Sequence, residues 1–243
     1  MQDTFTTLER EPVYLKVYKA IEERISTGVL EDGSLLPTEA VLCEQFGVTR
    51  SSVREGIRLL EQAGLVARGA GKRLVIARPR TADVARAASR SMTLSGATFR
   101  EVWDTLMAFY PEAARAAAVR LGPRDAAALR ECQEVLAALR DDQSEAVVTA
   151  AVAFFDILAM HLHNRVMAAL LQSLNRMIDK SLREVIGQTP QARRRILEAQ
   201  GRITEAIADQ DQAAAVNWMR KHIADLQRAY QVAHIDLDTE ITW

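Results

Sequence analysis

Residues 37–66 read PTEAVLCEQFGVTRSSVREGIRLLEQAGLV, and this stretch decides the fold of the N-terminal part of the chain. A short helix is predicted to open at Pro37 and to stop at Gly47, because glycine readily takes the left-handed conformation that ends a helix. Thr49 is predicted to cap the next helix. The buried face of that helix is predicted from apolar residues at helical spacing, namely Val53, Ile57 and Leu60.

The flanking residues complete a small domain. On the N-terminal side another helix is expected from Pro12 to Gly28, with one apolar face formed by Tyr14, Val17, Ile21 and Ile25. After Gly64, two short apolar runs flank the basic, Gly-rich residues 68–73, which predicts a β-hairpin. Three helices followed by a hairpin, over residues 12–78, form the pattern of a winged helix-turn-helix, and the chain as a whole is expected to be mainly α.

Charge is distributed unevenly along the chain. The whole sequence has a net charge of -1, which argues neither for nor against nucleic acid. Residues 48–80, however, hold eight basic and two acidic side chains, a net charge of +6. Such a local basic segment is typical of a surface that binds the DNA backbone.

A recognition helix enters the major groove with its first turns leading, so residues that contact DNA are expected there and at the hairpin tip. The candidate contacts are the polar and basic residues at these places, namely Thr38, Thr49, Arg50, Ser51, Ser52, Arg54, Arg68, Gly71 and Lys72. The alternative is a charged helix face exposed to solvent, and for Arg58 alone this interpretation is favoured.

The same region resembles the N-terminal domain of the GntR family of bacterial regulators. The resemblance rests on Leu36-Pro37, Glu39, Gly47-Val48-Thr49-Arg50, Val53-Arg54-Glu55-Gly56 and Gly64-Leu65-Val66. It implies a sequence-specific DNA-binding regulator, with Arg50, Ser51, Ser52 and Arg54 as recognition-helix contacts and Gly71-Lys72 at a minor-groove wing tip. Ala40 stands where many members have an Arg, so one of the family's DNA contacts is expected to be absent.

The rest of the chain, residues 81–236, is rich in Ala and Leu and predicts about seven helices. The expected spans are 81–94, 98–121, 123–140, 144–163, 165–187, 189–209 and 211–235. Pro111 falls inside the second span, so a kink or a break is expected there. This part resembles the all-helical ligand domain of the FadR branch of the same family, which implies effector binding and dimerisation.

Many members of that branch hold a divalent metal with one Asp and three His. Aligned on this chain, those positions are Ala151, Phe155, Gln200 and His222. Neither Ala nor Phe can coordinate a metal, and one His is not a site, so we expect the metal site to be lost and no cofactor to be present. His222 is interpreted as a core residue with a hydrogen bond, His161 and His163 as capping or surface residues, and His234 as solvated.

Without metal ligands the expected effector pocket is apolar. Its candidate residues are Trp103, Met107, Tyr110, Phe155, Leu158, Gln200, Trp218 and His222. For any one of them the alternative is ordinary core packing. As a set they lead to the hypothesis that the effector is apolar, such as an acyl chain or an acyl-thioester.

Other classes of protein are less compatible with the sequence. It contains no P-loop, Gly-rich dinucleotide turn, nucleophile elbow or Glu-x-x-His pair, so no enzyme is expected. A metal oxidase in the helical part and a non-specific architectural DNA binder are the alternatives.

Cys43 and Cys132 are too few for a disulfide framework and are expected to pack in the core. Residues 1–10 lack the apolar segment of a signal peptide, and no apolar run is long enough for a membrane span, so a cytoplasmic protein is expected.

The expected partners are double-stranded operator DNA, a small-molecule effector and a second copy of the chain. A homodimer is expected because the family's operators are nearly palindromic, which mirrors two-fold protein symmetry. A repressor relieved by its ligand is the predicted mode of action, since the resemblance implies that mode for most relatives.

Overall fold

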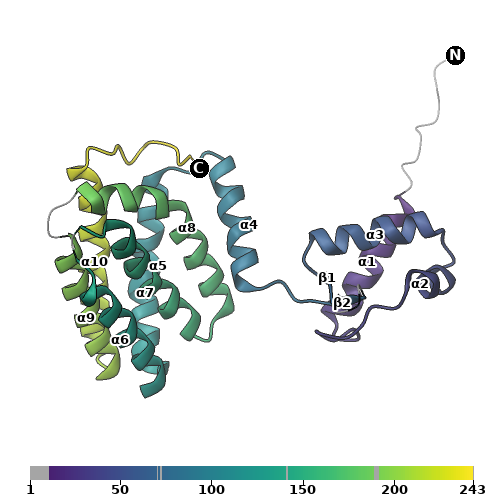
Figure 1. The fold of residues 1–243 in the computed structure, drawn as a ribbon, viewed down its shortest axis with the longest axis horizontal. Helices are drawn as coiled ribbons and strands as arrows, with labels where there is room; N and C mark the ends of the chain where they lie inside the picture. The colour runs from purple at the N-terminus through teal and green to yellow at the C-terminus, as the bar shows by residue number, and fades with distance from the viewer. Residues whose placement is uncertain (1–10, 70, 72, 141, 189–191, 243) are drawn as a thin grey trace, which may run out of the picture. The chain divides into compact units, whose positions relative to one another are not determined.

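The computed structural model describes residues 11–69, 71, 73–140, 142–188 and 192–242. The chain separates into two compact units, Met1–Arg80 and Thr81–Trp243, which we call the first unit and the helical unit. Within the described residues both are built mainly from helices (Figure 1), which confirms the predicted mainly α fold class. None of their helices combines the length and the apolar character that a membrane span needs.

The first unit contains three helices and one antiparallel hairpin in its described part. The elements are α1 (Val13–Ser26), α2 (Glu39–Phe46), α3 (Arg50–Gln62), β1 (Val66–Arg68) and β2 (Leu74–Ile76). The hairpin pairs Val66 with Ile76 and Arg68 with Leu74. This order of elements confirms the winged helix-turn-helix prediction.

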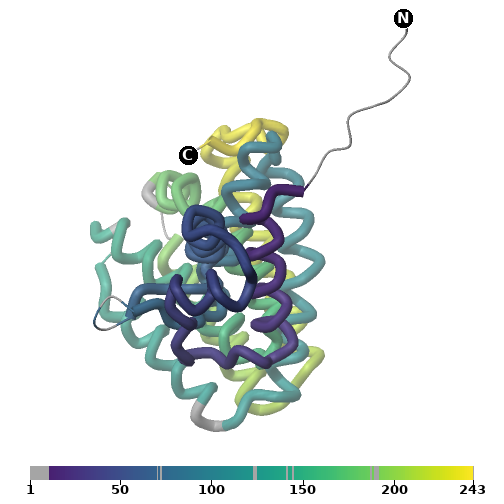
Figure 2. The backbone as a smooth tube through the Cα atoms, turned by 90° about the vertical axis from the view of Figure 1, so that its right-hand side faces the viewer, coloured from purple at the N-terminus to yellow at the C-terminus, as the bar shows by residue number. Residues whose placement is uncertain are grey.

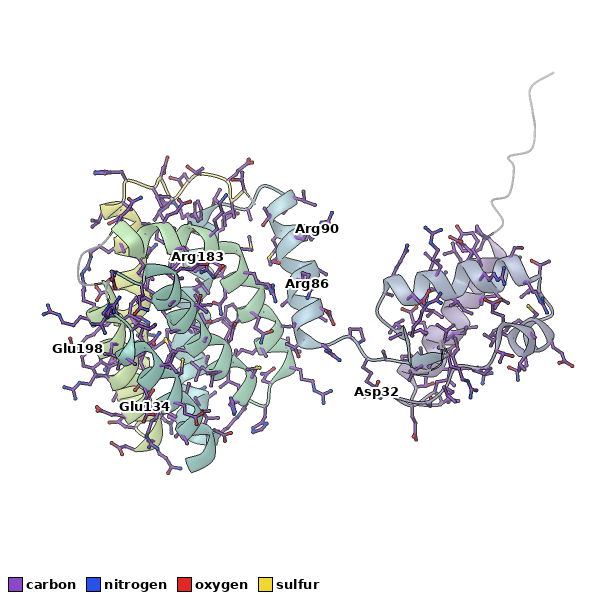
Figure 3. The ribbon with its side chains drawn as sticks, viewed as in Figure 1. Asp32, Arg86, Arg90, Glu134, Arg183 and Glu198 are labelled. Carbon is purple, nitrogen blue, oxygen red and sulfur yellow. The ribbon has the colours of Figure 1, made fainter. Side chains whose placement is uncertain are left out.

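Apolar periodicity and glycine placement explain how this unit folds. The predicted face of α3 is buried, with Val53 and Leu60 each 0% exposed, and the predicted face of α1 is buried except at Tyr14, which is partly buried. Gly47 ends α2 with a φ of 63°, the left-handed conformation that its sequence position predicts. A Cβ added at Gly56 would lie 2.9 Å from Val17 Cγ1, so the missing side chain is what allows α1 and α3 to pack closely. The backbone N–H of Arg78 donates to Asp32 (labelled in Figure 3) at 3.1 Å, which fixes the end of the hairpin.

The helical unit contains seven helices among the described residues, as predicted. They are α4 (Thr81–Leu94), α5 (Phe99–Arg120), α6 (Pro123–Ala138), α7 (Ser144–His161), α8 (Arg165–Gln188), α9 (Ala192–Ala208) and α10 (Gln212–Val232). Figure 2 shows them as a bundle, with the C-terminal segment in yellow at one end. That segment is held there by backbone hydrogen bonds from Phe99 to Thr239 and from Arg100 to Leu237.

Pro111 does not break α5. The helix runs continuously from Phe99 to Arg120, so of the two predicted outcomes the break does not occur. Proline removes one backbone hydrogen bond, but Tyr110, Pro111, Ala113 and Ala114 are all buried against neighbouring helices. Packing of this face therefore offsets the lost bond.

Candidate nucleic-acid interface and ligand pockets

The N-terminal turn of α3 gathers most of the predicted DNA contacts. Thr49 precedes the helix, and its hydroxyl accepts a hydrogen bond from the backbone N–H of Ser52 at 3.4 Å. The Ser51 hydroxyl lies 2.9 Å from the same oxygen. Arg50 and Ser51 are exposed, and Arg50 makes no ion pair within the described residues. A capped helix start with a free cation beside it suits an anionic backbone such as phosphate.

Arg54 is exposed but is not free. Its Nε donates to Glu39 Oε2 at 2.8 Å, which joins α3 to the first turn of α2. Only one nitrogen of the guanidinium is used in this pair, so the other two remain available to a base edge or a phosphate. The sequence motif includes Glu39, but no role is predicted for it. The opposite charges of Glu39 and of Arg54 on the next helix are the sequence feature that could have predicted this ion pair.

The start of α2 forms a second capped helix end. Thr38 is exposed, and its hydroxyl accepts from the backbone N–H of Val41 at 3.4 Å. Because Arg54 reaches Glu39, the starts of α2 and α3 are tied together by a side-chain contact. The geometry thus brings Thr38 and Arg54 to one region of the first unit.

The wing lies beside the other end of α3. Arg68 on β1 pairs with Glu61 near the end of α3, with Nε and Oε1 3.2 Å apart. Gly71 is exposed and has a φ of 72°, which glycine adopts without strain. Lys72, a predicted contact, lies outside the described residues. Arg58 pairs with Glu55 on its own helix at 3.8 Å and stays exposed.

In the helical unit, three of the predicted pocket residues surround one enclosed cavity. Trp103, Tyr110 and Phe155 line it, together with residues from α8 and α10, and its volume is about 10 Å³. This is room for about one water molecule. Tyr110 donates its hydroxyl to Asn175 Oδ1 at 2.8 Å, and burial raises the pKa of Tyr110 well above its ordinary value.

The other five predicted pocket residues do not line this cavity. Leu158, Gln200 and His222 are buried, Met107 is partly buried, and Trp218 is partly buried beneath the Lys221 ammonium at 4.6 Å from its ring centre. A separate groove of about 1,000 Å³ lies between α6 and α7 and is lined by none of the predicted pocket residues. Cys132 lines that groove and is otherwise buried, while Cys43 is partly buried against the core of the first unit.

The family's metal-ligand positions hold groups that pack instead of coordinating. The Phe155 ring stacks on His222, with ring centres 5.4 Å apart and an angle of 6° between the planes. Gln200 Nε2 donates to the backbone carbonyl of Ala151 at 3.0 Å. Alanine and phenylalanine offer no donor atom, so these residues do not fit a divalent metal. Elsewhere in the described ranges, no three His, Cys, Asp or Glu side chains come together as a metal-binding group.

Three buried polar atoms in this region have no hydrogen-bond partner. They are Trp103 Nε1, Gln200 Oε1 and His222 Nε2. His222 lies in the core, as expected. Burial lowers the pKa of His222 to about 4, so the ring is neutral at pH 7. Unpartnered buried groups cost about 1–3 kcal/mol each, which makes them candidates for ligand contact.

The remaining histidines lie near the surface. His161 is partly buried, with Nδ1 2.8 Å from the carbonyl of Ile157 and Nε2 3.6 Å from Asp125. His163 and His234 are exposed and both have positive φ angles, 51° and 56°.

The chain is similar to known bacterial regulators along most of its length. Residues 13–76 match the family described as "Bacterial regulatory proteins, gntR family", and residues 101–225 match the FCD domain. The "Glc operon transcriptional activator" of Escherichia coli strain K12 is 27% identical over 227 residues, 90% of this chain and 89% of that protein. An uncharacterized HTH-type transcriptional regulator of Mycobacterium tuberculosis is 31% identical over 167 residues, 68% of each chain. The solved structure of Streptococcus agalactiae GntR covers 89% of this chain and 99% of its own, with a TM-score of 0.68 at 20% identity, and is similar in fold.

Proposed function

This chain belongs to the GntR family of bacterial regulatory proteins and carries an FCD domain, and from this premise we propose that it is a repressor whose operator binding is controlled by a small molecule. As a member of that family it is a DNA-binding transcription regulator with an effector-binding FCD domain. The proposal adds the residues that contact DNA, the sign of regulation, the chemistry of the effector and a homodimeric state.

The exposed start of α3 carries the DNA-binding part of the proposal. Arg50 and Arg54 are both exposed there, and the Thr49 side chain occupies only the N–H of Ser52, so other N–H groups of the first turn can meet a phosphate. We assign base-edge or phosphate contacts to Arg50, Ser51, Ser52 and Arg54, and phosphate or minor-groove contacts to Thr38, Thr49, Arg68, Gly71 and Lys72. Affinity for the backbone then comes from charge, and sequence preference comes from the arginine side chains.

The effector is proposed to be apolar, such as an acyl chain or an acyl-thioester. Aromatic and aliphatic side chains dominate the wall of the enclosed cavity, and the neighbouring His222 is neutral at pH 7. Because the cavity has a volume of only about 10 Å³, a ligand can enter only if side chains around it move. Tight binding of citrate or gluconate in calorimetry, abolished by a chelator, would contradict this part of the proposal.

A homodimer and repression complete the proposal. Large apolar side chains are exposed on the helical unit, with Leu94 74% and Val166 80% accessible, and a second copy is proposed to cover some of this surface. The E. coli relative is named an activator, whereas the Klebsiella aerogenes "Histidine utilization repressor", 38% identical over 69 residues, carries the opposite sign in its name. A reporter fused to the protein's own promoter, measured with and without the regulator, decides the sign for this chain.

The central experiment is a gel shift at fixed salt. The DNA is the region upstream of the protein's own gene, and the competitor is the same DNA with its sequence scrambled. A sequence-specific regulator should bind the native DNA far more tightly than the competitor. Equal affinity for both would favour a non-specific architectural protein and overturn the proposal.

A further inference from the structure

A pocket with charged and amide side chains on part of its wall, which we call the polar pocket, lies on the helical unit outside the enclosed cavity. Its volume is about 540 Å³, within the range of about 300–1,000 Å³ that is typical of small-molecule sites. Its wall is formed by side chains from α4, α7 and α8. The charged and amide groups among them are Asp156, Gln172, Asn175, Arg176, Asp179 and Lys180.

The two cations on this wall are available to a ligand. Arg176 and Lys180 are four residues apart on α8, so they share one face of the helix. Both are exposed, and neither makes an ion pair with any residue that the structure describes. An anionic group in the pocket would therefore meet two cations that are not held in ion pairs.

The two carboxylates on the wall differ in their hydrogen-bond partners. Asp179 is matched by Arg183 (labelled in Figure 3), whose Nε and Nη2 reach its oxygens at distances of 3.1–3.2 Å. Asp156 is partly buried, and its Oδ1 accepts one hydrogen bond, from Asn175 Nδ2 at 3.1 Å. Burial raises the pKa of Asp156, and the nearby Arg176 opposes that shift only in part. Asp156 is thus a desolvated carboxylate that a cationic group would stabilise.

Asp156 is also held in place from behind. Asn175 is 6% exposed, and its amide connects two helices: Oδ1 accepts from Tyr110 on α5, and Nδ2 donates to Asp156 on α7. The Tyr110 hydroxyl fixes the orientation of the amide and therefore the position of the carboxylate. A polar group that is fixed before binding loses little freedom on meeting its ligand.

We propose that this pocket binds a small zwitterion with the chemistry of an α-amino acid. The carboxylate of the ligand lies between Arg176 and Lys180, and its ammonium group donates to Asp156. This is a second ligand site, which shares Val152 and Asn175 with the wall of the enclosed cavity, and it goes beyond the proposed function.

The position of the pocket connects it to the start of α4. Ala82, in the first turn of α4, lines the pocket, and α4 begins at Thr81, directly after the last residue of the first unit. A bound zwitterion contacts both α8 and this first turn. A ligand held between α4 and α8 would shift α4 only if it bound one position of that helix more tightly than another.

The test uses the full-length protein in thermal-shift and calorimetric titrations with the common L-amino acids. At least one amino acid is expected to raise the melting temperature. The best binder is then compared with its decarboxylated amine and with its deaminated acid, and both analogues are expected to bind at least about tenfold more weakly. No stabilisation by any amino acid, or equal binding of either analogue, would overturn the proposal.

Variants locate the site. Asp156→Asn and Lys180→Gln are each expected to weaken amino-acid binding at least about tenfold, the loss expected for a hydrogen bond to a charged group. Arg220→Gln, which removes an exposed charge on α10, serves as the matched control and should bind as the parent does. Circular dichroism of each variant verifies the fold. Unchanged binding in both pocket variants would place the ligand elsewhere and refute the assignment.

This result is independent of the proposed function. DNA binding of the ligand-free protein is measured by gel shift, whereas occupancy of the pocket is measured by calorimetry without DNA. A protein that binds an amino acid but no DNA would refute the proposed regulatory function and leave the amino-acid site in place.

Discussion

In the first unit the predicted DNA-contacting side chains lie on the surface, whereas in the helical unit the predicted ligand-contacting side chains lie mainly in the core. The predicted DNA-contacting residues that the structure describes fall within residues 38–71, and most of their side chains are exposed. The cavity of the helical unit is lined from α5, α7, α8 and α10, which are far apart in the chain. A surface that meets a polymer can be encoded by neighbouring residues, but a cavity must be assembled by tertiary packing.

The two units also differ in how their polar atoms are satisfied. Around α3, exposed polar groups hydrogen-bond to helix caps or to one another. In the core of the helical unit, Trp103 Nε1, Gln200 Oε1 and His222 Nε2 are buried without partners. We therefore expect the helical unit to respond more strongly to changes in ligand and pH, and the first unit to changes in charge.

The largest expected effect comes from rebuilding a metal site in the helical unit. The triple substitution Ala151→Asp, Phe155→His and Gln200→His supplies three donors around His222, at the positions where the family has its ligands. Zinc should then stabilise the variant by about 4 kcal/mol when its concentration is about 1,000 times its dissociation constant. Differential scanning calorimetry with and without zinc measures the shift.

The parent chain is the control for this experiment. Because Ala151 and Phe155 offer no donor atoms, its melting temperature should not respond to zinc. Stabilisation of the parent by zinc would show that another set of residues binds the metal. A triple variant that folds but ignores zinc would show that the four positions do not converge.

The next largest effect is a loss of stability at acidic pH. In the folded protein burial lowers the pKa of His222 to about 4, whereas an unfolded chain titrates near 6.5. Between these values the unfolded chain binds more protons, so stability falls as pH is lowered through this range, by up to roughly 3 kcal/mol. Urea unfolding at several pH values measures the slope.

His222→Phe isolates this contribution. The substitution removes the titrating group and keeps an aromatic ring against Phe155, and since Nε2 has no partner, little hydrogen bonding is lost. The variant should be less sensitive to pH between about 6.5 and 4. An identical pH dependence in both proteins would assign the effect to another group.

Local signals in the sequence predict the elements of both units well. The helix predicted over 98–121 is observed as Phe99–Arg120. Its start is fixed by a capping box between Thr98 and Glu101, two residues that lie within one turn of each other. The hairpin after Gly64 follows from the same kind of evidence. These elements depend on residues close together in the chain, which a single sequence displays.

Tertiary partners are what the sequence does not display. Tyr110 and Asn175 are 65 residues apart, and in sequence Asn175 is simply a polar residue on an amphipathic helix. Only the packing of α5 against α7 and α8 gives it two partners and places Asp156 beside the polar pocket. Pro111 gives the same lesson, since a local rule predicted a kink or a break and burial keeps the helix continuous.

A smaller effect is expected from the surface of the first unit. Arg54→Ala should weaken operator binding by about 1–3 kcal/mol, because it removes a guanidinium from the start of α3. Glu39→Gln should change binding by less, since it releases Arg54 without deleting it. Gel shifts at fixed salt measure both. Arg130→Ala, an exposed position on α6, is the control and should bind as the parent does. An unchanged shift with Arg54→Ala would remove this residue from the interface.

The smallest effect distinguishes two helix caps of similar chemistry. Thr49 caps α3 and Thr98 caps α5, each through its hydroxyl. Replacing either with Ala should lower the free energy of unfolding by about 1 kcal/mol, and replacement with Ser should largely restore it, because serine supplies the same acceptor. Urea unfolding followed by circular dichroism tests whether the two Ala variants lose the same free energy of unfolding. Only Thr49→Ala should also weaken DNA binding in a gel shift, since α3, and not α5, is proposed to contact DNA. If Thr98→Ala weakened DNA binding as much, the contrast between the two units would not hold, because a helix cap outside the first unit would then contribute to DNA binding.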